Sequence, residues 1–152
     1  MTKRIFKSIF LAAFCVLLAS LVIITGCLYE YYSKTFENQM RDELDLAAAA
    51  VDISGSEYLK AIAPSGYLSL IDKNGKVLYD TVQDADTLAN HADRDEVKQA
   101  LENGDGSSTR YSSTLLKKTT YIAKKLGNGN ILRISSSRAT VGMLVFEAMQ
   151  PL

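Results

Sequence analysis

Histidine is nearly absent from this sequence. It has one histidine, His91, so a metal site with two histidines is excluded, and a histidine-based catalytic triad would have to use this residue. His91 comes just before a predicted helix, which favours a surface position or a helix-capping role. Neither GxGxxG nor GxxxxGK followed by Ser or Thr, the motifs that cradle nucleotide phosphates, is present. We therefore predict no catalytic residue, no cofactor and no metal site in this chain.

An excess of charge of one sign is also lacking, because 17 Lys and Arg balance 17 Asp and Glu. Residues 30–137 hold 13 basic and 16 acidic side chains, which argues against binding of nucleic acid. One acidic cluster comprises Asp84, Asp86, Asp93 and Asp95. It lacks the alternating, glycine-centred spacing of an EF-hand calcium loop, so we expect a solvated acidic surface there.

Cysteines are scarce and lie in one place. Cys15 and Cys27 both fall inside residues 8–29, a run of 22 residues without a charged side chain. At about 1.5 Å per residue a helix of this length reaches roughly 33 Å, enough to cross a bilayer core of about 30 Å. Basic residues precede it within residues 1–7, which predicts a cytoplasmic N-terminus and an extracytoplasmic remainder in the cell membrane. The outer part has no cysteine, and hence no disulfide.

Cys27 allows two interpretations of the membrane run. Ile24-Thr25-Gly26-Cys27 has the form at which lipoprotein precursors are cleaved and lipidated, which would make the chain a lipoprotein binding module anchored through Cys27. However, the run is longer than the apolar part of a signal peptide, which is about 7–15 residues. Tyr29, Tyr31 and Tyr32 also stand where an interfacial aromatic belt belongs. These features favour an uncut membrane helix over residues 8–29.

Helical periodicity continues beyond the membrane run to about Asp52, and no Gly or Pro interrupts it between Cys27 and Ser54. Its apolar residues, which recur every three or four positions, are Tyr32, Phe36, Met40, Leu44, Ala47 and Val51. This face either packs on the following domain or, in its membrane-proximal part, forms a helix–helix seam in a dimer.

The rest of the chain alternates short β-rich runs with one compact helix. Strands are predicted over residues 66–72 and 76–81, joined by a turn at Asn74-Gly75, and over 107–115, 119–126 and 130–137. A helix is predicted over 93–104, beginning with Asp93 and Glu96 in a capping-box-like pair. The order predicts an α+β domain over residues 30–137, in which the long helix packs on a five-stranded antiparallel sheet. Residues 138–152 are predicted to begin a second membrane helix.

The predicted strands at the end of this domain are basic. Between Gly106 and Arg133 there are six basic residues and no acidic one, whereas residues 72–105 hold nine acidic residues. This asymmetry could give internal electrostatic complementarity. It could also line a pocket for a small anionic ligand, with Arg110 and Arg133 as clamps and Tyr121 as a wall. The basic residues beside turns are expected to be solvated: Lys117, Lys118, Lys124 and Lys125.

Four short motifs follow one another within residues 90–135: H-x-D-R-x-E-V at 91–97, R-x-S-x-T-L at 110–115, Y-x-A at 121–123 and L-R-I-S at 132–135. In their order and spacing they resemble the extracellular Cache/PAS-like sensor region of bacterial sensor histidine kinases of the phosphate-regulon type. The matching residues are His91, Asp93, Arg94, Glu96, Val97, Arg110, Ser112, Thr114, Leu115, Tyr121, Ala123, Leu132, Arg133, Ile134 and Ser135. The N-terminal residues resemble the first membrane helix and signalling helix of the same proteins.

This resemblance implies the input half of a two-component system. Such proteins form homodimers and continue with a second membrane helix, a phosphorylated histidine and an ATP-binding kinase domain, which would use ATP and Mg²⁺ and act on a response regulator. Kinase activity would belong to that parent protein. His91 would lie on the wrong side of the membrane to be the phosphorylated histidine. The sensor region of a chemoreceptor or of a diguanylate cyclase is an alternative with a similar outer domain.

Overall fold

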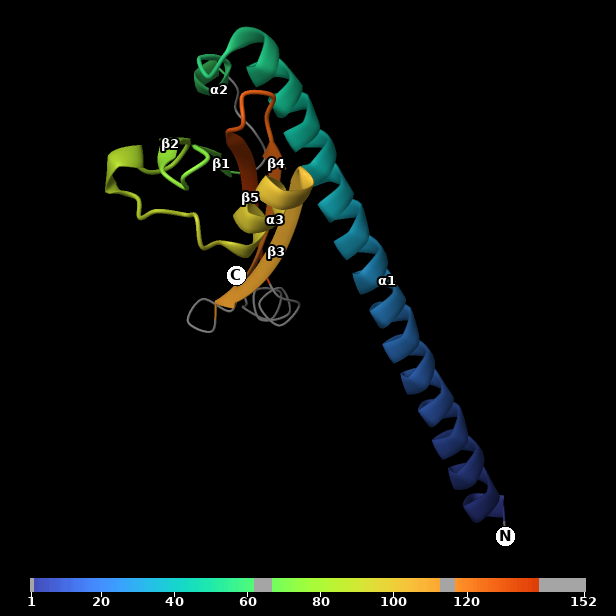
Figure 1. Ribbon diagram of the computed structural model, residues 1–152. Coiled ribbons are helices and arrows are strands. Elements are labelled where there is room, and N and C mark those ends of the chain that lie inside the picture. The colour runs from blue at the N-terminus through green and yellow to red at the C-terminus, as the bar shows by residue number, and fades with distance from the viewer. Residues whose placement is uncertain (1, 62–66, 113–116, 140–152) are drawn as a thin grey trace. The chain divides into compact units, whose positions relative to one another are not determined.

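The computed structural model describes residues 2–61, 67–112 and 117–139. A long helix, two strands, a helix and three strands follow one another in it, as the α+β prediction requires (Figure 1). In chain order the elements are α1 (Thr2–Ser54), α2 (Tyr58–Ala61), β1 (Tyr67–Ile71), β2 (Val77–Asp80), the 3₁₀ helix η1 (Ala85–Thr87), α3 (Asp95–Asn103), β3 (Asp105–Ser112), β4 (Lys117–Lys125) and β5 (Ile131–Ala139). The chain divides into two compact units, Met1–Asn38 and Gln39–Leu152, and α1 contributes to both. The predicted fold class is confirmed.

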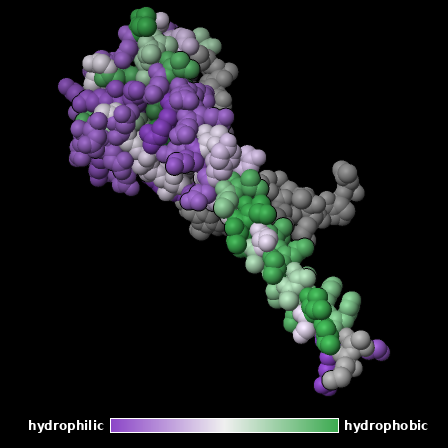
Figure 2. Space-filling model, turned by 90° about the vertical axis from the view of Figure 1, so that its right-hand side faces the viewer, coloured by the Kyte–Doolittle hydropathy of each residue, from purple (hydrophilic) through white to green (hydrophobic). Residues whose placement is uncertain are grey.

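The first unit consists of the early turns of α1. By length and composition α1 is apolar enough to cross a membrane, and its large apolar side chains between Ile5 and Leu28 are 44% to 71% exposed. They gather along this part of the helix, as Figure 2 shows. The helix passes through Gly26 and Cys27 without a break, and the Cys27 side chain is exposed. The uncut membrane helix stays a prediction, and lipidation of Cys27 stays the alternative to it.

The second unit is built on one five-stranded antiparallel sheet with strand order β2-β1-β5-β4-β3. β1, near the start of this unit, pairs with β5 at its end, so that Leu68 lies opposite Ile134 and Leu70 opposite Leu132. Because side chains alternate between the two faces of a strand, these four apolar residues share one face of the sheet. Each of the four is at most 5% exposed.

The last turns of α1 cover that face. Lys124 of β4 donates to the Asp45 carboxylate at 2.7 Å, and the backbone N–H of Gly127 donates to the Asp52 carboxylate at 3.2 Å. The inner side of the helix is buried through Met40, Leu44, Ala47, Ala48 and Val51. Packing of the helix on the sheet is therefore confirmed from Met40 onward, whereas Tyr32 is 63% exposed. Lys124, expected to be solvated, is 34% exposed and also bonded to Asp45, and this hydrogen bond raises its pKa.

The opposite face carries α3 and a second apolar cluster, formed by Ile71, Val77, Val97, Ala100, Ala123 and Ile131. The backbone of α3 comes very close to β3 at Gly106. A Cβ added to Gly106 would lie 2.0 Å from the carbonyl oxygen of Glu96, so a residue without a side chain is required there. This close approach directs the first turn of α3 toward the middle of the sheet.

Two predictions are wrong: the capping-box-like start of the helix with Asp93 and Glu96, and the surface position of His91. The helix begins at Asp95 with Arg94 as its N-cap, and the side chain of Arg94 makes no capping hydrogen bond. Asp93 is exposed and pairs with Lys98 at 3.3 Å, while Glu96 turns into the protein instead of back to the helix terminus. His91 is 6% exposed, so it is not a surface residue, and its backbone carbonyl accepts from the N–H of the N-cap residue Arg94 at 3.1 Å. Its backbone N–H donates to the Gly75 carbonyl at 2.7 Å, which holds this segment against the β1–β2 turn.

The ends of the strands differ from the predicted ones by a few residues. β3 starts at Asp105, and its predicted end, with Thr114 and Leu115, lies outside the described residues. β5 extends to Ala139, two residues beyond the predicted strand, because it stays paired with β4 as far as Lys117. Arg138 and Ala139, predicted to begin a second membrane helix, therefore belong to β5. The rest of that predicted helix lies outside the described residues.

Candidate ligand-binding site

The strand register brings polar residues together at one end of the face that carries α3. Arg133 of β5 lies opposite Ser69 of β1, and Ser69 lies opposite Asp80 of β2. In the neighbouring row, Tyr121 of β4 lies opposite Ser135. The apolar cluster fills the other end of this face, so the polar row marks the point where the packing of α3 ends.

A pocket with a volume of about 350 Å³ opens over these rows. It is lined by Tyr67, Asp80, Val82, Gln83, Leu88, His91, Arg94, Arg110, Tyr121, Arg133 and Ser135. The three residues predicted to bind an anion, Arg110, Tyr121 and Arg133, come from three adjacent strands and all line it. Its size is at the lower end of the range for small-molecule sites, which is about 300–1,000 Å³.

Both guanidinium groups lie near the ring of Tyr121. The central carbon of Arg110 is 4.5 Å from the ring centroid and that of Arg133 is 5.4 Å from it. Such cation–π contacts orient the two side chains while leaving their N–H groups free to meet oxygen acceptors. Tyr121 therefore positions the two arginine side chains and lines the pocket beside them.

Glu96 joins the two arginines from behind. Its side chain is completely buried and accepts from Arg110, from Arg133 at 3.4 Å and from the Ser108 hydroxyl at 2.6 Å. Burial alone would raise the pKa of this carboxyl group. The hydrogen bond from Ser108 and the neighbouring charge of Arg110 outweigh it and lower the pKa below its usual value. Glu96 is thus a buried, ionised carboxylate.

A chain of polar contacts continues from Arg133 to the edge of the sheet. A second guanidinium nitrogen of Arg133 donates to the Ser69 hydroxyl at 3.1 Å, and Ser69 donates to the Asp80 carboxylate at 2.7 Å. The contacts therefore run Asp80–Ser69–Arg133–Glu96–Arg110. Burial lowers the pKa of Arg133, and the nearby charge of Glu96 opposes this, so the guanidinium keeps its charge.

Two buried polar atoms beside the pocket have no hydrogen-bond partner among the described residues. They are Nε of Arg133, whose residue is 7% exposed, and Nδ1 of His91. Burial, followed by the charges of Arg133 and Arg94, lowers the pKa of His91 to about 4. The imidazole is therefore neutral near pH 7 and can act as donor or acceptor, whereas the Arg133 Nε–H can only donate.

Sequence reasoning missed Glu96, Ser69, Asp80 and His91 as members of this cluster. One signal for Glu96 was available: it stands four residues before Ala100 and beside Val97, so a helical projection places it on the buried side of α3. Ser69 and Asp80 could be assigned only from the pairing of β1, β2 and β5, which a single sequence does not reveal.

Comparisons with known proteins give little family information. No family model matches the chain, and no curated protein matches it. One solved structure that it resembles is described as the "extracellular domain of the putative histidine kinase rpHK1S-Z16". The two are 18% identical with a TM-score of 0.40, and the likeness covers 61% of this chain and 39% of that one.

Proposed function

We propose that this chain is the sensing and signal-input region of a membrane-anchored sensor histidine kinase, and that its outer domain binds a small anionic ligand at Arg110, Tyr121 and Arg133. The sequence resemblance, the membrane-length helix α1 and the pocket support this proposal. Homodimerisation, an extracytoplasmic location, and action of the parent protein on a response regulator with ATP and Mg²⁺ belong to the same proposal.

The main evidence for a bound ligand is a pair of buried atoms without a hydrogen-bond partner among the described residues, Nε of Arg133 and Nδ1 of His91. Leaving a buried polar group without a partner costs about 1–3 kcal/mol, and more for a charged group. A ligand oxygen that accepts from the Arg133 Nε–H would recover this cost. The neutral imidazole of His91 could receive a second polar group of the same ligand.

The charges around the pocket favour an anion. Arg94, Arg110 and Arg133 contribute three positive charges, whereas Asp80 and Glu96 contribute two negative ones. With the imidazole neutral, one positive charge is left for a ligand carboxylate or phosphate. Arg110 is the side chain best placed to share it, because about a third of that side chain is exposed, whereas Arg133 is held on both sides.

A route from the pocket to α1 exists within the second unit. Tyr121 and Lys124 both belong to β4, and Lys124 holds Asp45 of α1 from the opposite face of the sheet. A ligand that shifts Tyr121 would thus displace a strand to which α1 is tied. Because α1 also carries the apolar membrane-length run, its displacement is the proposed output of the domain.

The experiment uses the full chain in lipid nanodiscs, with thermal unfolding followed in the presence of small monocarboxylates and inorganic phosphate. A ligand at about 100 times its dissociation constant should stabilise the domain by about 2.7 kcal/mol. Arg110→Ala should abolish this gain. Lys118→Ala, a matched loss of one exposed basic residue on β4 outside the pocket, should retain it. Equal stabilisation of the Arg110→Ala and wild-type chains, or stabilisation by no anion, would contradict the proposal.

A further inference from the structure

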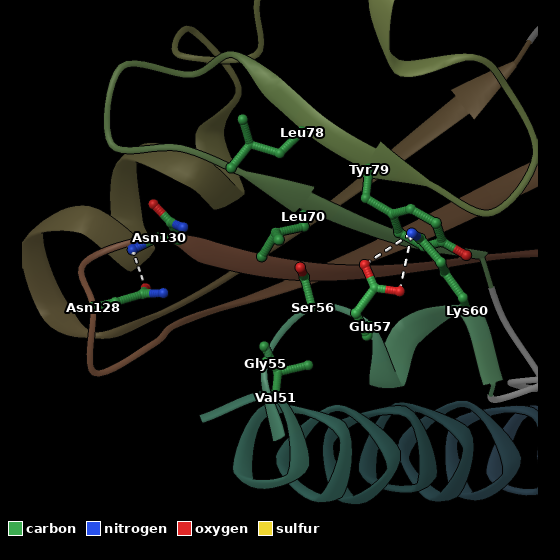
Figure 3. Close-up of a pocket in the computed structure, with 10 residues that line it drawn as sticks. All are labelled: Val51, Gly55, Ser56, Glu57, Lys60, Leu70, Leu78, Tyr79, Asn128 and Asn130. Carbon is green, nitrogen blue, oxygen red and sulfur yellow. Dashed lines mark hydrogen bonds and ion pairs between the residues drawn. The ribbon is translucent and has the colours of Figure 1, made fainter. Parts of the chain in front are cut away.

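A second pocket lies at the end of α1, where this helix meets α2, the β1–β2 hairpin and the β4–β5 turn (Figure 3). It has a volume of about 300 Å³, and its lining includes Val51, Leu70, Leu78, Tyr79, Asn128 and Asn130. None of these residues lines the pocket of the two arginines. The two pockets can therefore be tested separately.

The floor of this pocket is apolar. Val51 and Leu70 are each 5% exposed, and both face the space that Figure 3 shows between helix and sheet. Leu78 of β2 lines the same space, and its apolar side chain is 45% exposed. The ring of Tyr79 is held in place because its hydroxyl donates to the Leu59 carbonyl at 3.2 Å. The result is a fixed apolar surface against which a ligand could lie.

The rim, in contrast, offers neutral hydrogen-bonding groups. In the described part of the chain, no hydrogen bond engages the Ser56 hydroxyl or the Asn130 carboxamide, and Asn128 uses only its oxygen, which accepts from the Asn130 backbone N–H at 2.9 Å. Glu57 and Lys60 pair with each other at 2.9 Å, so their charges cancel. The pocket has no net charge with which to select an anion or a cation.

From these features we propose that the second pocket binds a neutral, polyhydroxylated molecule about the size of a monosaccharide. A carboxamide has both donors and an acceptor, as a hydroxyl does, so Asn128 and Asn130 suit neighbouring hydroxyl groups of one ligand. The C–H face of such a ligand would cover Leu78 and Tyr79, where apolar surface is left exposed. A purely apolar ligand would leave the carboxamides unpaired, and a charged one would meet no free counter-charge.

Binding here would act on the end of α1. The pocket joins Val51 and Gly55 of that segment to β2 and to the β4–β5 turn. Gly55 has a φ of +76° and ends the helix, donating from its N–H to the Val51 carbonyl at 2.8 Å. A bound sugar would bridge the helix end and the sheet, adding to the hydrogen bond between Asp52 and Gly127. The site goes beyond the proposed function and does not depend on it.

The test is a titration of the full chain in nanodiscs with D-glucose, D-galactose and N-acetyl-D-glucosamine, followed by ligand-observed NMR and by thermal unfolding. At least one sugar should bind saturably. Leu78→Trp, which fills the pocket from a partly exposed position, should abolish binding. Asn130→Ala, which keeps the turn backbone, should weaken binding about tenfold. Ile53→Trp introduces the same bulk on α1 at an 86% exposed residue outside the pocket and should bind like wild type.

The outcomes against the proposal are equally defined. Saturable binding of none of the three sugars overturns it, as does binding that persists in both Leu78→Trp and Asn130→Ala. If Leu78→Trp does not fold, Asn130→Ala decides alone. Arg110→Ala should leave sugar binding unchanged, so loss of anion binding in that variant and loss of sugar binding in Asn130→Ala report on two different sites.

Discussion

Glu96 is the residue whose replacement should most clearly expose the energetics of the arginine cluster. Glu96→Ala removes the carboxylate that accepts from Arg110, Arg133 and Ser108. Arg110 can turn toward water because about a third of its side chain is already exposed. Arg133 cannot, since it is 7% exposed, and among the described residues it keeps the Ser69 hydroxyl as a hydrogen-bond acceptor and the Tyr121 ring as a neighbour, neither of which carries a negative charge. The variant therefore leaves a buried cation without a counter-charge.

Removing one partner of a buried ion pair costs about 3–5 kcal/mol, against a total stability of roughly 5–15 kcal/mol for a domain. We expect Glu96→Ala to fall in this range. Glu96→Gln keeps an acceptor but loses the charge, and should cost about 1.5–3 kcal/mol. The double replacement Glu96→Ala with Arg133→Met removes both charges and should regain most of the loss of the single variant, because no buried ion remains unpaired.

Pulse proteolysis in urea on the full chain in nanodiscs measures these differences, since it reports the cleavable fraction of the outer domain. Asp45→Ala is the matched control: it removes a carboxylate from a partly exposed ion pair with Lys124 and should cost at most about 1 kcal/mol. A loss of stability in Glu96→Ala no larger than that in Asp45→Ala would contradict a buried, uncompensated Arg133. A double variant less stable than Glu96→Ala alone would contradict it as well.

Two further changes should be measurable by urea unfolding. Burial lowers the pKa of His91 from 6.5 to about 4, so between these pH values the unfolded chain binds a proton that the folded chain does not. The free energy of unfolding therefore has its full value above about pH 6.5 and falls by about 3 kcal/mol as the pH drops to 4. His91→Gln should flatten this loss, and an unchanged pH profile would contradict the assignment. Gly75→Ala should cost clearly more than Gly129→Ala. Both glycines have φ near +85°, a conformation that costs alanine about 1–2 kcal/mol. Only at Gly75 would the added Cβ also meet neighbouring atoms, at 2.3 Å from the Ala92 nitrogen. Equal losses of stability in the two variants would argue against this close approach.

Local sequence patterns predict most of the fold. The helical period from Met40 to Val51 identifies the side of α1 that packs on the sheet, and Asn74-Gly75 marks the turn between β1 and β2, where Gly75 adopts a positive φ. These signals are local, because they depend on residues within one or two turns of chain. Strand ends were less accurate, since β5 extends as far as its pairing with β4 allows.

The candidate site was only half predictable for the same reason. Arg110, Tyr121 and Arg133 stood out as basic and aromatic residues within strands, and the register brings them together. The local spacing of Asp93 and Glu96 predicts a helix cap. The actual position of Glu96 depends on the close approach of α3 to Gly106, a contact that no local pattern encodes.

The pairing of α1 with the end of the domain has a consequence for synthesis. Asp45 and Asp52 of the first helix bind Lys124 and Gly127, which stand 79 and 75 positions later in the chain. At about 5–20 residues per second, the inner side of that helix waits roughly 4–16 seconds for the strands that will cover it. During this interval Leu44 and its neighbours are exposed, so the nascent helix needs either the bilayer surface or a chaperone to shield it. A soluble fragment starting after Val51 would lack half of one core and should not fold.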